Sequence, residues 1–294
     1  MMQISATTRS FAAVSAAFGR DLETSFALIE RMLWRARARD AALVVFPECA
    51  LGGYPREVPG NAGGAWDDPP AIAPDGPEIA RLSRLAGPTV VCVGYTERAP
   101  GGPYSSSVCV SGDGVLGRHR KVHVPPAETL SYRPGAGFAA FDTPIGRLGM
   151  LTCYDKVFPE AARALALDGA ELIASMAAWP TCRTTPARLI ARDAQTAHFD
   201  LLDRARAVEN QVVWVSANQS RRLGRLRFIG RAKVVDPTGV VLASTGGRPG
   251  VALAPVATDA VARTRGALSH LGDRRPGAYE LGPSLGGAAA PATV

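Results

Sequence analysis

The sequence is poor in lysine, and it contains neither a long hydrophobic run nor a regular cysteine pattern. No segment is apolar over the length needed to span a bilayer, and the alanine-rich run from Phe11 to Phe18 is too weakly apolar for a signal peptide. The cysteines stand at irregular positions: Cys49, Cys92, Cys109, Cys153 and Cys182. This spacing matches no disulfide framework and no CxxC metal site. These absences predict a soluble cytoplasmic protein with reduced thiols, no metal site and no membrane partner.

Arginine supplies almost all of the positive charge. The chain has thirty arginines, three lysines (Lys121, Lys156 and Lys233) and a formal net charge of +7. The arginines are spread along the chain without interleaved aromatic residues, whereas a nucleic-acid-binding tail would concentrate them. We therefore expect no nucleic-acid partner. Because the chain uses arginine so consistently, each lysine is of interest. In Arg118-His119-Arg120-Lys121, two arginines precede the lysine, which indicates that position 121 needs a compact ammonium group, with a chance occurrence as the alternative.

With 294 residues, 47% of them apolar, the chain can bury the core of one large α/β domain. Nothing in it resembles a linker, so residues 1–282 are predicted to form a single domain. A low-complexity tail follows over 283–294 and is expected to dock onto a partner subunit. The stretch 56–77 is rich in glycine, proline and aspartate, which predicts a long loop at the wall of a pocket.

Helical and strand patterns alternate along most of the chain. Helices are predicted over 21–39, 78–86, 159–167 and 186–210, and strands over 41–46, 89–95, 146–151, 171–175 and 212–217. Two hairpins interrupt this alternation, with turns at 112–114 and 236–239. Two mixed β-sheets packed face to face between outer helices accommodate every segment. The predicted fold is therefore an α/β fold with four layers, an αββα sandwich.

Cys153 stands where an apolar strand is predicted to give way to a helix. The run from Gly146 to Leu151 has the pattern of a buried strand, and Pro159 suits the first turn of the helix that follows. Such an elbow can expose a nucleophile beside backbone N–H groups that hold an oxyanion. Taken alone, Cys153 is better explained as a small buried hydrophobic residue, the commoner state of a free cysteine.

Two further reactive side chains follow predicted strands. Glu48 ends the apolar strand Leu43 to Phe46, and Lys121 follows a strand of the first hairpin. Either one, taken alone, could be an ordinary surface charge. A thiol is mostly protonated at neutral pH, so a nucleophilic Cys153 needs a base to remove its proton or a cation to stabilise its thiolate. Glu48 can supply the base and Lys121 the cation.

The three segments resemble the Glu-Lys-Cys signature of the nitrilase superfamily of carbon–nitrogen hydrolases. The resemblance continues in order over roughly residues 10 to 270. Its motifs are Phe46-Pro47-Glu48 with Gly53-Tyr54, Arg120-Lys121-Val122-His123 with Glu128 and Pro134-Gly135, Cys153 with Phe158-Pro159-Glu160, Arg204 to Asn210, and Asp236-Pro237-Thr238-Gly239. It implies an αββα sandwich, a homodimer or higher homo-oligomer, and no cofactor.

The resemblance also implies a role for each residue. Glu48 is expected to be the general base, Cys153 the nucleophile and Lys121 the cation that faces the tetrahedral oxyanion. The backbone N–H of Tyr154 is expected to be the second oxyanion donor. Glu128 matches an additional glutamate of the family, which would hold Lys121 and the leaving nitrogen in place.

A cysteine–histidine pair is the competing arrangement. His119 and His123 alternate with Lys121, so the three side chains would point to one side of an extended segment. This alternative would make the glutamate and lysine segments coincidences. We therefore prefer the arrangement of Glu48, Lys121 and Cys153.

The residues near Cys153 bear on the substrate. Nitrilases of this superfamily usually have Trp-Glu after the nucleophile, whereas this chain has Tyr154-Asp155, which resembles the amidase and carbamoylase branches. Tyr54 and Trp179 are candidate substrate-binding residues, with a core position as the alternative for Trp179. The prediction is an amidohydrolase that cleaves a small linear amide through a cysteine thioester and releases ammonia or an amine. The alternatives are an N-carbamoyl amidohydrolase, an acyltransferase that uses the same acyl-enzyme, a true nitrilase and a non-catalytic binding protein.

Overall fold

The computed structural model describes residues 7–55 and 69–279. The helices are α1 (Leu22–Arg37), α2 (Pro77–Ala86), α3 (Pro159–Leu167), α4 (Ala194–Asn210) and α5 (Ala260–Ala267). The strands are β1 (Thr8–Ala16), β2 (Ala41–Val45), β3 (Val90–Glu97), β4 (Tyr104–Ser111), β5 (Gly114–Arg120), β6 (Phe141–Thr143), β7 (Gly146–Thr152), β8 (Leu172–Ala177), β9 (Val213–Leu223), β10 (Leu226–Ile229), β11 (Lys233–Val235), β12 (Val241–Ser244) and β13 (Gly250–Ala257). The predicted tail over 283–294 and most of the predicted loop over 56–77 lie outside the described residues. Within the described part of the chain, no helix is long and apolar enough to cross a membrane.

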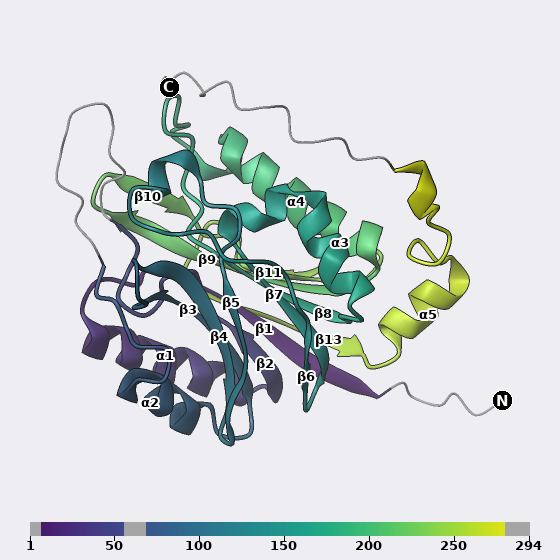
Figure 1. Ribbon diagram of the computed structural model, residues 1–294, viewed down its shortest axis with the longest axis horizontal. Coiled ribbons are helices and arrows are strands. Elements are labelled where there is room, and N and C mark those ends of the chain that lie inside the picture. The colour runs from purple at the N-terminus through teal and green to yellow at the C-terminus, as the bar shows by residue number, and fades with distance from the viewer. Residues whose placement is uncertain (1–6, 56–68, 280–294) are drawn as a thin grey trace.

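Two layers of sheet stack face to face, and helices cover both outer faces (Figure 1). The first layer has the order β5-β4-β3-β2-β1, with β13 on the other edge of β1. The second has the order β9-β8-β7-β6, with β11 on the other edge of β9 and β12 beside β11. Helices α1 and α2 pack on the first layer, and α3 and α4 on the second. This is the predicted αββα sandwich. Its two sheets are joined at one end, where Ser15 pairs with Asn218 and Ala16 with Gln219.

Alternation of side chains along the strands separates three apolar cores. In β2, Val44 belongs to the core under α1 and α2, whereas Leu43 and Val45 belong to the core between the sheets. In β9, Trp214 packs under α3 and α4, while Val215 lies between the sheets. Successive side chains of a strand point to opposite faces, so a strand that is buried on both faces has a continuous apolar sequence. For this reason the apolar runs predict β2 and β8 correctly.

The sequence prediction misses β1 and β13, which pair with each other along their whole length in the first layer. Small residues such as Ala12 and Ala13 dominate β1, and Pro255 interrupts β13. Neither segment therefore has the β-branched and aromatic composition that marks a strand. Ala12 and Ala13 are nevertheless fully buried, because neighbouring strands and both adjoining cores surround them.

The last predicted long helix begins at Ala194, later than expected. The segment before it is irregular because the Asp193 carboxylate binds backbone N–H groups of this segment. The Asp193 carboxylate accepts hydrogen bonds of 2.9–3.0 Å from three backbone N–H groups, those of Cys182, Ala187 and Gln195. The bond from Gln195 caps α4, and the other two fold the preceding segment back onto the start of this helix.

Candidate active site

Four strands end around one buried site. Glu48 follows β2, Lys121 follows β5, Cys153 follows β7 and Ala178 follows β8. The strands β2, β1, β9, β8 and β7 run parallel to one another, and β5 has the same direction after two antiparallel steps from β3. Their carboxyl ends therefore meet at one end of the sandwich, which is where the sites of α/β sheets assemble.

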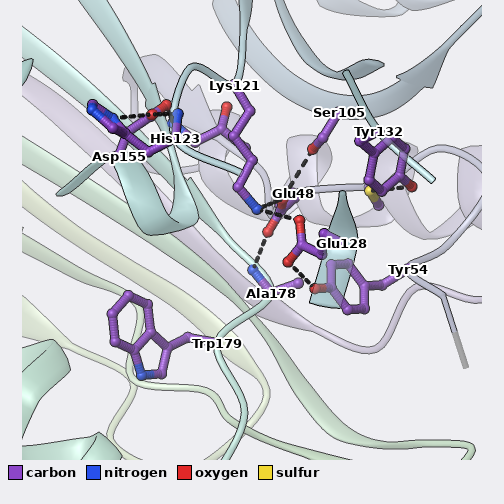
Figure 2. A network of polar contacts seen from close by, with 12 residues as sticks. Glu48, Tyr54, Ser105, Lys121, His123, Glu128, Tyr132, Asp155, Ala178 and Trp179 are labelled. Atoms are coloured by element: carbon purple, nitrogen blue, oxygen red, sulfur yellow. Dashed lines mark hydrogen bonds and ion pairs between the residues drawn. The ribbon is translucent and has the colours of Figure 1, made fainter. Parts of the chain in front are cut away.

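Glu48 is fully buried, and three donors hold its carboxylate (Figure 2). Oε1 accepts from Ser105 Oγ at 2.9 Å and from Lys121 Nζ at 3.0 Å. Oε2 accepts from the backbone N–H of Ala178 at 3.0 Å, and Gln219 Nε2 donates to the Glu48 carbonyl oxygen at 3.1 Å. These partners come from four different segments of the chain, so the tertiary fold sets the orientation of the carboxylate.

Lys121 lies between two carboxylates and is also fully buried. Its Nζ donates to Glu48 Oε1 at 3.0 Å and to Glu128 Oε2 at 2.6 Å, and Tyr54 donates to the other oxygen of Glu128 (Figure 2). Burial alone would lower the pKa of Lys121, but Glu128 and Glu48 raise it well above its ordinary value. The structure therefore brings these four predicted residues together around a charged ammonium group.

Cys153 occupies the predicted elbow between β7 and α3. It begins a short 3-10 turn, Cys153–Val157, and its φ of 50° lies in the left-handed region that side chains disfavour. The residue is 6% exposed and lines a cavity of about 490 Å³. Burial and the charge of Glu48 raise the pKa of the thiol well above its ordinary value, although Lys121 opposes this rise. The thiol is therefore protonated at neutral pH and needs a base to ionise it.

Both polar and apolar residues line the cavity. Tyr54, Glu128, Cys153, Tyr154 and Trp179 line it, including both predicted pocket residues. Its other lining residues are Pro125, Ala127, Val157, Ala178, Pro180, Arg183, Gln195, His198, Leu201, Leu202 and Leu226. The indole of Trp179 is held in place because its Nε1 donates to Gln195 Oε1 at 2.8 Å. The volume suits a small molecule.

Asp155 connects the two reactive segments of the site. Five donors surround its carboxylate within 3.2 Å: the backbone N–H groups of Val122, His123 and Thr152 and the rings of His119 and His123. Both histidines of the competing hypothesis thus contact Asp155. Figure 2 shows His123 beside this carboxylate. Burial alone would raise the pKa of Asp155, but the hydrogen bonds from His119 and His123 hold it well below its usual range.

Asp155→Asn is expected to destabilise the protein at neutral pH, and progressively less as the pH falls below about 4. A carboxylate whose pKa is lower in the folded state contributes stability above its unfolded pKa, about 3.9, and loses this contribution as the pH falls toward the folded value. At pH 7 the variant should therefore be less stable by on the order of 2 kcal/mol. Urea unfolding at a series of pH values from 7 down to about 2 measures this decline.

Asp142→Asn is the matched control, because Asp142 is an exposed carboxylate in a surface ion pair with Arg147. It should leave the stability unchanged across this pH range. An Asp155→Asn effect of the same size in acid and at neutral pH would show that the charge of Asp155 does not carry the stabilisation.

Residues 11–266, most of the chain, match the carbon–nitrogen hydrolase family. The chain therefore belongs to this family and so to the nitrilase superfamily. Among its relatives, Probable nitrilase C965.09 of Schizosaccharomyces pombe is 32% identical over 206 residues, 68% of this chain and 69% of that protein. The N-carbamoylputrescine amidase of Arabidopsis thaliana is 28% identical over 283 residues, 89% of this chain and 90% of that protein. The crystal structure of Saccharomyces cerevisiae Nit3, a member of branch 10 of the nitrilase superfamily, matches with a TM-score of 0.74 at 26% identity, covering 89% of this chain and 94% of that one.

The groups that orient Glu48 were not predicted from the sequence; they are Ser105, the N–H of Ala178, and Gln219. Each lies in an ordinary strand or turn, and no local signal marks it. In the described ranges, no three His, Cys, Asp or Glu side chains gather as the ligands of a metal ion would. That the enzyme needs no cofactor stays a prediction.

Proposed function

We propose that the protein hydrolyses a small linear amide through a thioester on Cys153, with Glu48 as the general base and Lys121 as the oxyanion cation. The observation that carries this proposal is the buried cluster of Glu48, Lys121 and Glu128 at the wall of the cavity that Cys153 lines. Burying charged groups is costly, and clusters of this kind concentrate at functional sites. Membership of the family supports cleavage of a carbon–nitrogen bond, and an amidase among the relatives supports an amide as the substrate.

In the first half-reaction, Glu48 removes the proton from the Cys153 thiol as the sulfur attacks the carbonyl carbon of the amide. The electron pair of the C=O bond moves onto the oxygen, where the Lys121 ammonium and the backbone N–H of Tyr154 stabilise it. The tetrahedral intermediate then collapses and the C–N bond breaks. Protonated Glu48 gives its proton to the leaving nitrogen, so ammonia or an amine departs and the thioester remains.

In the second half-reaction, Glu48 takes a proton from water, and the hydroxide attacks the thioester carbonyl. Collapse of this intermediate expels the sulfur, which regains its proton from Glu48, and the acid is released. Because burial raises the pKa of the Cys153 thiol, the attack requires a base, and this is the role assigned to Glu48. Glu128 holds Lys121 in place, Tyr54 holds Glu128, and the Glu128 carboxylate offers an oxygen atom to the leaving nitrogen.

An acyl adduct on Cys153 tests the proposal directly. The protein is mixed with a panel of linear amides and N-carbamoyl compounds, quenched in acid during turnover, and examined by intact-protein and peptide mass spectrometry. We expect the mass of the acyl group of a substrate on the peptide that contains Cys153. The Cys182→Ser protein, which lacks the more exposed thiol, should give the same adduct. Turnover with an adduct confined to another residue would contradict the proposal.

The same panel distinguishes the related activities. A carbamoyl adduct would favour an N-carbamoyl amidohydrolase. This alternative is retained because the Arabidopsis relative is an N-carbamoylputrescine amidase. Transfer of the trapped acyl group to an added amine or alcohol in preference to water would favour an acyltransferase, and turnover of nitriles a nitrilase. The homodimer and the cytoplasmic location stay predictions.

A further inference from the structure

Two of the three lysines lie outside the proposed catalytic cluster, around a second buried carboxylate. Lys156 is fully buried, and its Nζ donates to Asp203 Oδ1 at 2.8 Å. Lys233 Nζ donates to Asp203 Oδ2 at 2.6 Å and lies 3.1 Å from Asp200 Oδ1. Trp214 Nε1 also donates to Asp203, at 2.9 Å. One fully buried carboxylate therefore accepts hydrogen bonds from two ammonium groups.

This ionic cluster carries one more positive than negative charge. Its cations are Lys156, Lys233 and Arg231, and its anions are Asp203 and Asp200, which pairs with Arg231. The ring of Phe199 faces both ammonium groups, and its centroid lies 3.2 Å from Lys156 Nζ and 4.1 Å from Lys233 Nζ. An aromatic face attracts cations, but it supplies no formal charge. The excess positive charge is therefore not neutralised inside the cluster.

Lys156 lies directly behind a wall of the cavity. It belongs to the same short turn as Cys153, and its Nζ is 5.3 Å from the ring centroid of Trp179, whose side chain lines the cavity. The ammonium itself is fully buried, so it lies on the protein side of the indole. An electrostatic interaction across an apolar wall is weakly screened, and the excess charge therefore acts on whatever occupies the cavity.

The described lining of the cavity offers little to balance this charge. Glu128 is the one carboxylate among the described lining residues, and Lys121 and Tyr54 already bind it. Arg183 adds a further positive charge to the same lining. A cationic group on a substrate would meet like charge without an unpaired carboxylate from these residues.

We propose that Lys156 makes the cavity electropositive and thereby excludes amides whose remote end is cationic, which restricts the substrates to amides with a neutral or anionic remote end. This inference rests on the proposed amide hydrolysis. The indole of Trp179 alone would attract a cation. The ammonium behind it reverses that preference.

Two amides of the same shape test the inference on the unmodified protein. 4-(Trimethylammonio)butanamide and 5,5-dimethylhexanamide differ by one permanent charge, and the ratio of their kcat/KM values cancels pH effects on the chemistry. We expect the neutral amide to be preferred by at least about tenfold at pH 7. Burial and the charge of Lys233 lower the pKa of Lys156 to about 8, although Asp203 opposes this effect. The preference should therefore shrink between pH 7 and pH 9, because Lys156 loses its positive charge over this range. The charged or titratable groups that face Lys156 are Asp203 and Arg206 from α4, Lys233 from β11 and Cys153 from its own turn.

Lys156→Met removes the excess charge and leaves Asp203 paired with Lys233. The preference for the neutral amide should fall by about tenfold and become independent of pH. Lys233→Met is the matched control, because it removes one charge from the same cluster and leaves Lys156 behind Trp179. Because this variant also brings the cluster to a net charge of zero, it should lose part of the preference, but less than Lys156→Met does. Since Lys233 lowers the pKa of Lys156, the remaining preference should extend to higher pH. Equal losses in the two variants would assign the effect to the net charge of the cluster and not to Lys156.

A folded Lys156→Met protein with the wild-type preference would overturn the inference. The inference would also be overturned if the wild-type preference for the neutral amide stayed constant from pH 7 to pH 9. This measurement needs no variant. Equal kcat/KM values of the wild type for the two amides would contradict the inference and leave the proposed function intact. If neither amide nor any member of the panel is hydrolysed, the proposed function fails, and the inference fails with it.

Discussion

Cys153→Ala is expected to lower kcat/KM for a substrate amide by at least about 10⁴-fold, because the sulfur is the atom that would bond to the acyl group. The fold should be retained. The sulfur borders a cavity, so its removal opens no new enclosed void. Steady-state kinetics together with thermal unfolding of the wild type and the variant measure both parts of this prediction.

Cys182 provides the control, because it is the more acidic thiol in the resting protein. The hydroxyl groups of Thr185 and Thr184 lower the pKa of Cys182 to about 7, whereas burial raises that of Cys153. An alkylating reagent should therefore modify Cys182 first without stopping hydrolysis. Cys182→Ser should retain the wild-type rate. Amide hydrolysis that survives in Cys153→Ala, or that disappears in Cys182→Ser, would exclude the proposed nucleophile.

Asp203→Asn is expected to destabilise the protein by about 3–5 kcal/mol, the usual effect of leaving buried charges without their partner. The Asp203 carboxylate holds the ammonium groups of Lys156 and Lys233, and it is itself fully buried. An asparagine of nearly the same shape would leave both lysines with no counter-charge from this position. Because the total stability of a domain is about 5–15 kcal/mol, this loss should be plain in urea unfolding.

A second substitution shows whether charge is the cause. Lys156→Met combined with Asp203→Asn should recover part of the lost stability, because one fewer ammonium group is then buried without a partner. Asp142→Asn, at an exposed position, should have no measurable effect. Wild-type stability in Asp203→Asn alone would show that the carboxylate of Asp203 does not hold the cluster together.

Local signals were sufficient for the elements and residues that carry their own pattern. The helix predicted over 159–167 is observed as Pro159–Leu167, because proline suits the first turn and Gly169 adopts the positive φ that ends the helix. Glu48, Lys121 and Cys153 were found because each follows a strand within a recognisable motif. By contrast, β1 and β13 carry no local pattern, because their burial depends on the neighbouring strands.

The family motifs and the four-layer arrangement could be predicted from the amino-acid sequence, and the reactive roles of Glu48, Lys121 and Cys153 stay predictions from the same motifs. The tertiary structure alone decided how those residues are held. The three donors to the carboxylate of Glu48 lie 57, 73 and 130 residues away along the chain, so no window of sequence contains them. The same is true of Lys156 and Lys233, which are far apart in the sequence and come together at Asp203 and Phe199. Hydrogen bonds and charge pairs depend on distance in space, and only the folded chain brings these groups within reach of one another.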